Sequence, residues 1–147
     1  MMQRVHRILT EPPWQDSFAG EIRDMRSRME SKPVNDLKRA AGGMVDIEFT
    51  VQTLQLRHLA DYPEILVPGT VSGIEALRGA GLLSEADAAH LTKSYRILRR
   101  VESALRLMSA TDRHAVPETQ EESARLTYLL GPGNENWFET CQRLMAK

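Results

Sequence analysis

The chain has 147 residues, of which 41% are hydrophobic and 27% charged, and its formal net charge at pH 7 is -1. These values are typical of one globular domain that can bury a core, and they argue against wholesale disorder and against a nucleic-acid binder held mainly by phosphate contacts. A single cysteine, Cys141, excludes an internal disulfide framework. With no apolar run near the roughly 18–20 residues that cross a bilayer and no signal-peptide core, we expect a cytoplasmic protein that binds neither membrane nor nucleic acid.

The N-terminal segment reads as the end of a longer element. A short amphipathic stretch around Ile8 has no upstream partner for its apolar side and stops at two prolines. We therefore expect residues 1–14 to be the remnant of an upstream connection, with a free N-terminal helix as the alternative. Residues 15–147 are predicted to form a single helical domain.

The next stretch predicts an amphipathic helix that ends near Pro33. Its apolar side chains recur at helical spacing and are Phe18, Ile22, Met25 and Met29. Its other faces carry three arginines, Arg23, Arg26 and Arg28. They are candidate partners for a buried acid, although arginines on a surface helix are more often only solvated.

A glycine pair, Gly42 and Gly43, opens the helix predicted to end near His58. Glycine permits a positive φ or a close backbone approach, and free N–H groups at a helix N-terminus attract anions. Because Lys38 and Arg39 stand just upstream, the turn could hold a phosphate or a carboxylate. A simple tight turn is the more economical interpretation, since this pattern is neither a P-loop nor a dinucleotide fingerprint.

This helix is apolar on two flanks, with a polar line between them. The apolar residues are Met44, Ile47, Val51 and Leu54 on one flank and Val45, Phe49 and Leu56 on the other. The polar line consists of Glu48, Gln52 and Gln55, at i, i+4 and i+7. A helix so widely apolar should be covered on several sides, so these three side chains should be largely buried and hydrogen-bonded, Glu48 most plausibly to an arginine. The network either fixes helix register or faces a ligand or neighbouring domain. Asp46 falls on the solvent face and cannot share an ion with Glu48.

The following helices are bounded by capping signatures. Thr70 is a candidate N-cap for a short helix that stops near Gly81, and Ser84 with Asp87 begins the longest helix, of about 25 residues. The core stripe of that helix is predicted to be Leu91, Tyr95, Leu98, Val101, Leu105 and Met108. Its remaining positions form the most basic surface of the chain, made of Lys93, Arg96, Arg99, Arg100 and Arg106. That surface is either solvated or contacts an anionic ligand or partner domain.

Two shorter helices complete the chain, one ending at Gly131 and one running from Trp137 to Met145. No segment alternates with period 2, so strands are not expected. The fold class predicted is therefore all-α, a bundle of about five to seven helices with one long central-to-C-terminal helix. We find no nucleophile elbow, no His-Glu-x-x-His and no Cys-x-x-Cys, and we predict no catalytic residue and no metal site.

The stretch DLKRAAGGMVDIEFTVQTLQLRH, residues 36–58, closely resembles the segment that follows the nucleotidyltransferase domain in glutamine synthetase adenylyltransferase, the bifunctional adenylyltransferase and adenylyl-tyrosine phosphorylase. Residues 21–30, 63–88 and 95–108 resemble the helical region of the same family. The form Val-Asp-Ile-Glu-Phe is closer to that of the C-terminal, adenylylating half.

This resemblance implies a parent enzyme that uses ATP and magnesium to transfer AMP to a tyrosine of glutamine synthetase, and removes it by phosphorolysis, in nitrogen regulation. Its implied partners are an upstream nucleotidyltransferase domain, glutamine synthetase and a PII-type signal protein. The family holds magnesium in a Gly-Ser-x-x-Asp-x-Asp-like motif, which this sequence lacks. The chain is therefore expected to be an accessory or regulatory helical domain that binds no cofactor and is inactive alone.

Two sets of residues are candidates for contact with other domains or partners. The cleft or domain-interface candidates are Lys38, Arg39, Gly42, Gly43, Asp46, Glu48 and Gln52. In an alternative function, a non-enzymatic interaction module, an acidic partner would dock on Lys93, Arg96, Arg99 and Arg100. A further alternative is the equivalent domain of a PII uridylyltransferase.

Overall fold

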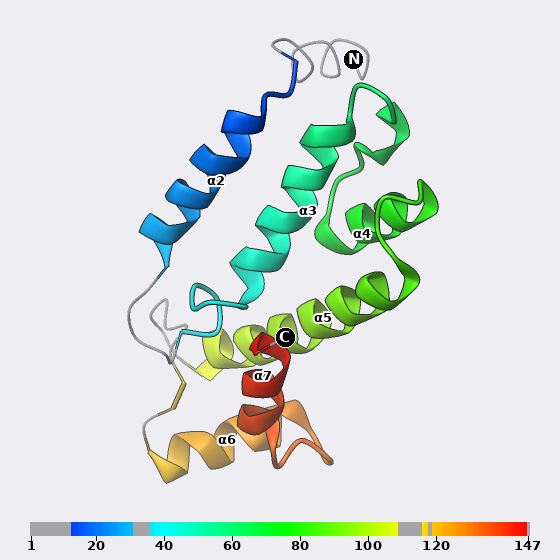
Figure 1. Cartoon of the computed structure of the whole chain (residues 1–147). Coiled ribbons are helices and arrows are strands. Elements are labelled where there is room, and N and C mark those ends of the chain that lie inside the picture. The colour runs from blue at the N-terminus through cyan, green and yellow to red at the C-terminus, as the bar shows by residue number, and fades with distance from the viewer. Residues whose placement is uncertain (1–12, 31–35, 109–115, 118, 147) are drawn as a thin grey trace. The chain divides into compact units, whose positions relative to one another are not determined.

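The computed structural model describes residues 13–30, 36–108, 116–117 and 119–146. The elements in these ranges are α2 (Asp16–Met29), α3 (Met44–His58), the 3-10 helix η1 (Pro63–Ile65), α4 (Thr70–Gly79), α5 (Glu85–Met108), α6 (Gln120–Leu130) and α7 (Trp137–Met145) (Figure 1). None of the described residues belongs to a strand, so the predicted all-α class is confirmed. The predicted upstream remnant lies almost wholly outside the described residues.

The described residues pack into two compact units. The first unit contains α2, α3 from Ile47 onward, η1, α4 and the beginning of α5. The second contains the described part of residues 30–46, α5 from Lys93 onward, α6 and α7. Two helices therefore run from one unit into the other. A single domain over residues 15–147 stays a prediction.

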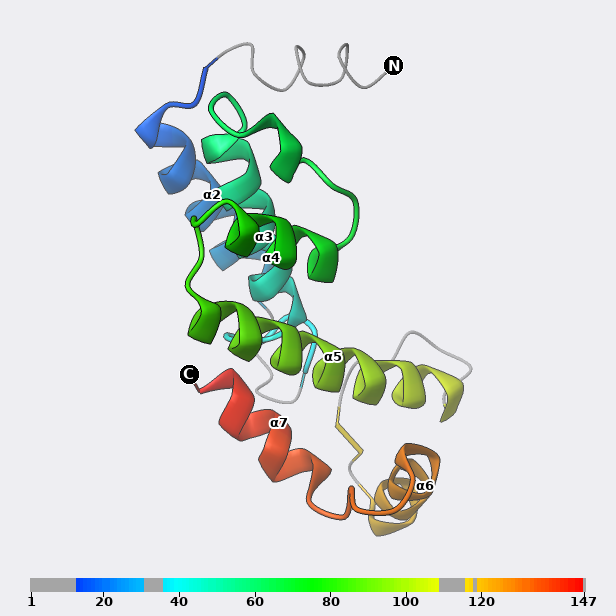
Figure 2. The same ribbon diagram turned by 90° about the vertical axis from the view of Figure 1, so that its right-hand side faces the viewer.

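In the first unit, α2 lies beside α3 in two perpendicular views (Figures 1 and 2). The fully buried apolar side chains of this unit are Val51, Leu59, Ile65, Ile74 and Leu77. Gly73 lets α4 come close to α3, because a Cβ at this position would lie 2.6 Å from Cγ1 of Val51. This close approach brings α4 over the middle of the central helix.

In the second unit, the core is built on the stripe predicted for α5. Leu98, Val101 and Leu105 are buried as expected, whereas Tyr95 and Met108 are only half-buried, as is Leu91 in the first unit's part of α5. The other buried apolar residues of this unit include Leu37, Met44, Leu126, Leu130, Trp137 and Cys141. The segment before α3 thus shares a core with α6 and α7.

Most helix boundaries follow the capping residues. The Ser84 hydroxyl accepts the backbone N–H of Asp87 at 3.1 Å, which confirms the predicted start of α5. Gly81 and Gly131 take positive φ values of 73° and 82° just beyond α4 and α6 and confirm the predicted stops. The predicted cap at Thr70 was wrong, because α4 already begins at this residue and its N-cap is Gly69.

Cys141 gives the second unit a pH-dependent stability. The thiol is fully buried on α7, and this burial raises its pKa from 9.0 to about 11. The unfolded chain releases the thiol proton near pH 9, so the contribution of this group is intact below pH 9 and is lost as the pH rises toward 11. In urea unfolding, the unaltered chain should lose stability over that interval more steeply than Cys141→Ala. Equal slopes for the two proteins would contradict this prediction.

Candidate functional site

The turn before the glycine pair is held by Asp36. Its carboxylate accepts the backbone N–H groups of Lys38 at 2.9 Å and Arg39 at 3.0 Å, and its carbonyl oxygen accepts the N–H of Ala40 at 2.9 Å. Aspartate favours such local bonds, which replace a helix or strand ladder with a turn. The main chain that carries the two candidate basic residues is therefore fixed. The Lys38 side chain is half-buried and that of Arg39 is exposed.

The N–H groups at the start of α3 are bonded within the chain. Gly42 donates to the Asp46 carboxylate, and Gly43 donates to the carbonyl oxygen of Ala40. The next two amides, of Met44 and Val45, donate to carbonyl oxygens of the preceding turn at 3.3 and 3.0 Å. The groups that an anion would need are thus already used. The segment is a tight turn, and an anion site here is not supported.

Gly42 and Gly43 are required by close backbone contacts within the second unit. Gly42 has a φ of +73°, and a Cβ there would collide with the main-chain carbonyl of Met145, lying 2.8 Å from its carbon. A Cβ on Gly43 would lie 2.8 Å from the carbonyl oxygens of both Leu37 and Ala40. The glycine pair therefore seats the last turn of α7 and closes its own turn.

The predicted polar line of α3 is buried only at one end. Gln55 is 7% exposed, and its side-chain amide donates to the carbonyl oxygens of Ile65 at 2.7 Å and Val67 at 3.2 Å. Glu48 is half-buried, but Gln52 is exposed, so the prediction was wrong for Gln52. Leu56, four residues further along, is also exposed, which shows that no described element covers this strip of α3. The buried amide is structural, since it secures η1 and the loop after it.

The candidate interface residues are divided between the two units. Asp46 is the last residue of α3 that belongs to the second unit. Its carboxylate accepts the N–H of Gly42, and the side chain is partly buried. The prediction that Asp46 faces solvent was therefore wrong. Glu48 and Gln52 begin the first unit's share of the same helix. An arginine partner for Glu48 stays a prediction.

The basic surface of α5 is partly used inside the second unit. Arg99 and Arg106 each lie 3.7 Å from the carboxylate of Glu102, which is 1% exposed. Arg100 donates to the carbonyl oxygen of Leu130 at the end of α6. Glu102 was not among the predicted site residues, although arginines three residues before and four residues after an acid mark such a pair.

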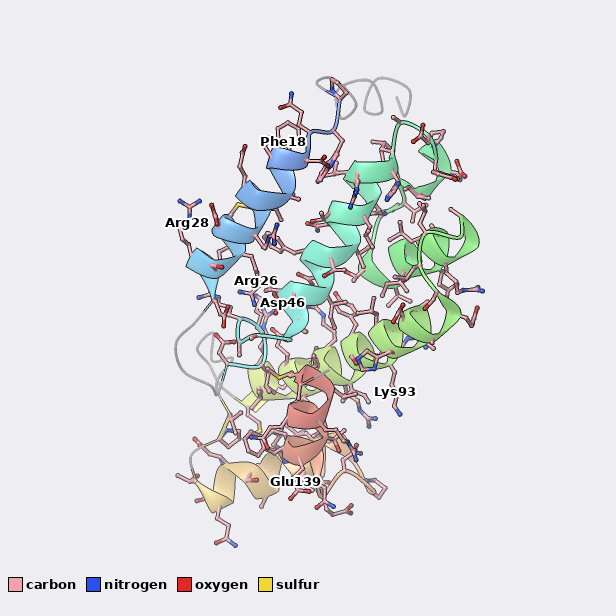
Figure 3. The ribbon with its side chains drawn as sticks, in the orientation of Figure 1. Phe18, Arg26, Arg28, Asp46, Lys93 and Glu139 are labelled. Atoms are coloured by element: carbon pink, nitrogen blue, oxygen red, sulfur yellow. The ribbon has the colours of Figure 1, made fainter. Side chains whose placement is uncertain are left out.

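The other two members of the basic surface are Lys93 and Arg96. Both are exposed, and Figure 3 shows Lys93 projecting from α5. Within the described ranges, no three His, Cys, Asp or Glu side chains are placed to hold a metal ion. In the same ranges, no helix is both long and apolar enough to span a membrane.

Comparison with known proteins places these features in a family. Residues 17–147 match the family described as GlnD PII-uridylyltransferase. The bifunctional glutamine synthetase adenylyltransferase/adenylyl-removing enzyme of Mycobacterium tuberculosis strain H37Rv is 36% identical over 114 residues, which cover 74% of this chain and 12% of that protein. The proteins of the same name from Caulobacter vibrioides and Mycobacterium leprae are 36% and 38% identical, covering 76% and 73% of this chain and 11% of each relative.

The chain thus spans about an eighth of the length of these relatives. The similarity extends over α2 to α7, and it agrees with the resemblance carried by the glycine turn and α3. The chain belongs to the GlnD PII-uridylyltransferase domain family and is related to the helical region of glutamine synthetase adenylyltransferases.

Proposed function

We propose that this chain is the helical domain of a glutamine synthetase adenylyltransferase, where it braces a nucleotidyltransferase domain of the same polypeptide. The observation that carries the proposal is the similarity, over about three quarters of the chain, to relatives named for that activity. The parent enzyme would use ATP and magnesium in the cytoplasm, act on glutamine synthetase and respond to a PII-type protein. This chain would be inactive alone, because its sequence lacks the magnesium-binding motif.

In this proposal the glycine turn and the start of α3 form the edge that faces the catalytic cleft. Asp36 and Asp46 fix the main chain of the turn on both sides of Gly42. Lys38 and Arg39 are then presented from a rigid support, and Glu48 and Gln52 are separate candidates on the first unit's part of α3. A rigid support is what interface and positioning residues need.

The test is transfer of labelled AMP from ATP to glutamine synthetase. We expect no transfer by the chain alone, and transfer when the nucleotidyltransferase domain of the parent polypeptide is added as a separate protein. If the nucleotidyltransferase domain were equally active with and without this chain, the bracing role would be wrong. Transfer by the chain alone would show a catalytic site of its own, with Asp46 and Glu48 the first residues to re-examine.

The assignment of Glu48 is tested in the same mixture. Glu48→Gln should lower AMP transfer by about tenfold, because a hydrogen bond to a charged group is worth about 1.5–3 kcal/mol. Glu75→Gln, at an exposed position on α4, is the matched control and should leave the rate unchanged. Equal rates for the two variants would remove Glu48 from the interface.

A second candidate function is the equivalent domain of a PII uridylyltransferase, since the matched family carries that description. It is distinguished by replacing ATP with UTP and glutamine synthetase with a PII protein in the same mixture.

A third candidate is a docking module for an acidic partner. Lys93→Glu with Arg96→Glu tests it better than any change at Arg100, because Arg100 also caps α6. Loss of partner binding without loss of catalysis would favour docking.

A further inference from the structure

The first helix of the family segment buries a charged residue and exposes two of its large apolar ones. Arg26 is the buried residue of α2, whereas Met25 and Met29 are 42% and 44% exposed. Phe18 and Ile22, which complete the same stripe, are half-buried. Figure 3 shows Arg26 on the side of α2 toward α3 and Arg28 on the opposite side. The most buried position of α2 therefore lies beside its apolar stripe, not at the centre of the stripe.

An amphipathic helix normally turns its apolar stripe toward a core. Four large side chains at i, i+4, i+7 and i+11 form a continuous strip about three turns long, and a strip of this kind marks an interaction site. Methionine side chains are flexible and polarizable, so Met25 and Met29 suit a contact surface that must adapt to its partner. We call the set Phe18, Ile22, Met25 and Met29 the α2 stripe.

We propose that the α2 stripe is the surface on which the nucleotidyltransferase domain of the same polypeptide docks. This inference rests on the proposed function. The family match begins at residue 17, so α2 is the first helix of the matched segment, and about seven eighths of each relative lies outside the matched part.

The size of the stripe favours a linked domain over a second copy of the chain. A stable dimer buries about 1,200–2,000 Å² in total. A helix of 14 residues is about 21 Å long and offers a single narrow strip, much less than such an interface needs. For a domain of the same polypeptide, the stripe needs to supply only one part of a larger contact, so its small size is enough.

The experiment is calorimetric titration of the 147-residue chain with the separately expressed nucleotidyltransferase domain. Met25→Ser with Met29→Ser should weaken binding roughly tenfold or more, since interface residues at the centre of a contact carry most of its affinity. The matched control is Leu107→Ser with Leu129→Ser, two exposed apolar residues of the second unit, and it should bind like the unaltered chain. Met25→Leu with Met29→Leu should retain binding. Thermal unfolding followed by circular dichroism should be the same for all variants.

The possible results separate this inference from the proposed function. If the unaltered chain binds and supports AMP transfer but the serine variant binds equally well, the α2 stripe is not the docking surface and the proposed function stands. If Leu107→Ser with Leu129→Ser weakens binding as much as Met25→Ser with Met29→Ser, the inference is also wrong. If the unaltered chain does not bind the domain, the inference is wrong, and the proposed function fails as well if the mixture transfers no AMP. If the chain alone forms a dimer that the serine variant dissociates, a second copy covers the stripe and the inference is overturned.

Discussion

Gly42→Ala is expected to lower the free energy of unfolding by about 3 kcal/mol. A positive φ costs a residue with a Cβ about 1–2 kcal/mol, and forcing extra atoms into a packed contact costs about 1–3 kcal/mol. Both apply to Gly42, which has a φ of +73° and whose Cβ would collide with the carbonyl of Met145. Main-chain atoms cannot move aside as a flexible side chain can, so α7 or the turn must shift. Urea unfolding followed by circular dichroism measures the loss.

Gly81→Ala is the matched control. Gly81 has the same φ of +73°, but a Cβ there would meet nothing within 4 Å. Its substitution should cost only the conformational part, about 1–2 kcal/mol. The difference between the two variants isolates the packing of α7 on the glycine turn. Equal losses would show that α7 does not need a glycine beneath it.

A larger loss of stability for Gly42→Ala than for Gly81→Ala would explain the glycine pair without any ligand. The two residues are part of the stretch by which the chain resembles its family, and a glycine-rich segment before a helix suggests phosphate binding. The structure gives the same residues a packing role, because the N–H groups of Gly42 and Gly43 are bonded internally and Met145 lies where a side chain would be. A residue pattern alone cannot separate these uses, since both require glycine for close backbone approach.

Features decided within a few residues could be predicted from the sequence. The start of α5 depends on Ser84 and Asp87, and the ends of α4 and α6 depend on Gly81 and Gly131. Capping bonds reach only three or four positions along the chain, so the residues that make them are adjacent in the sequence. The side of α5 that faces the core could be predicted for the same reason, since the spacing of its apolar residues is a local feature of the sequence.

Features decided by which element covers which face could not be predicted. Gln52 and Gln55 lie on the same polar line, yet only Gln55 is buried, because η1 and the following loop fold over that end. Glu102 is flanked by arginines at helical spacing, but its burial depends on the packing of the second unit around α5. The exposed position of Met25 is the same kind of case, since periodicity identifies an apolar stripe but does not say what lies against it.

Gln55→Leu is expected to lower the free energy of unfolding by about 1–3 kcal/mol. The substitution keeps the volume but removes the side-chain donor for the carbonyl oxygens of Ile65 and Val67. The Ile65 oxygen keeps the backbone N–H of Val67 as a donor, so the main loss is at the Val67 oxygen, and a buried acceptor that loses its donor costs about 1–3 kcal/mol. Gly73 leaves little room for rearrangement, because its Cβ position lies 3.1 Å from the Gln55 amide nitrogen. Urea unfolding measures the total, and hydrogen exchange of the amides from residue 63 to residue 69 reports whether the loss is local.

Gln52→Leu makes the same chemical change on the same helix at an exposed position and should alter stability by no more than about 0.5 kcal/mol. If both variants lost the same amount, helix propensity would explain the effect and the amide would not be holding η1. If only Gln55→Leu is destabilised and exchange quickens only after Pro63, the buried amide joins α3 to the loop that leads into α4. The helix α3 would then hold the loop before α4 through the side-chain amide of Gln55, whereas the turn before α3 holds α7 through the bare backbone of Gly42, and only Gln55 belongs to the polar line.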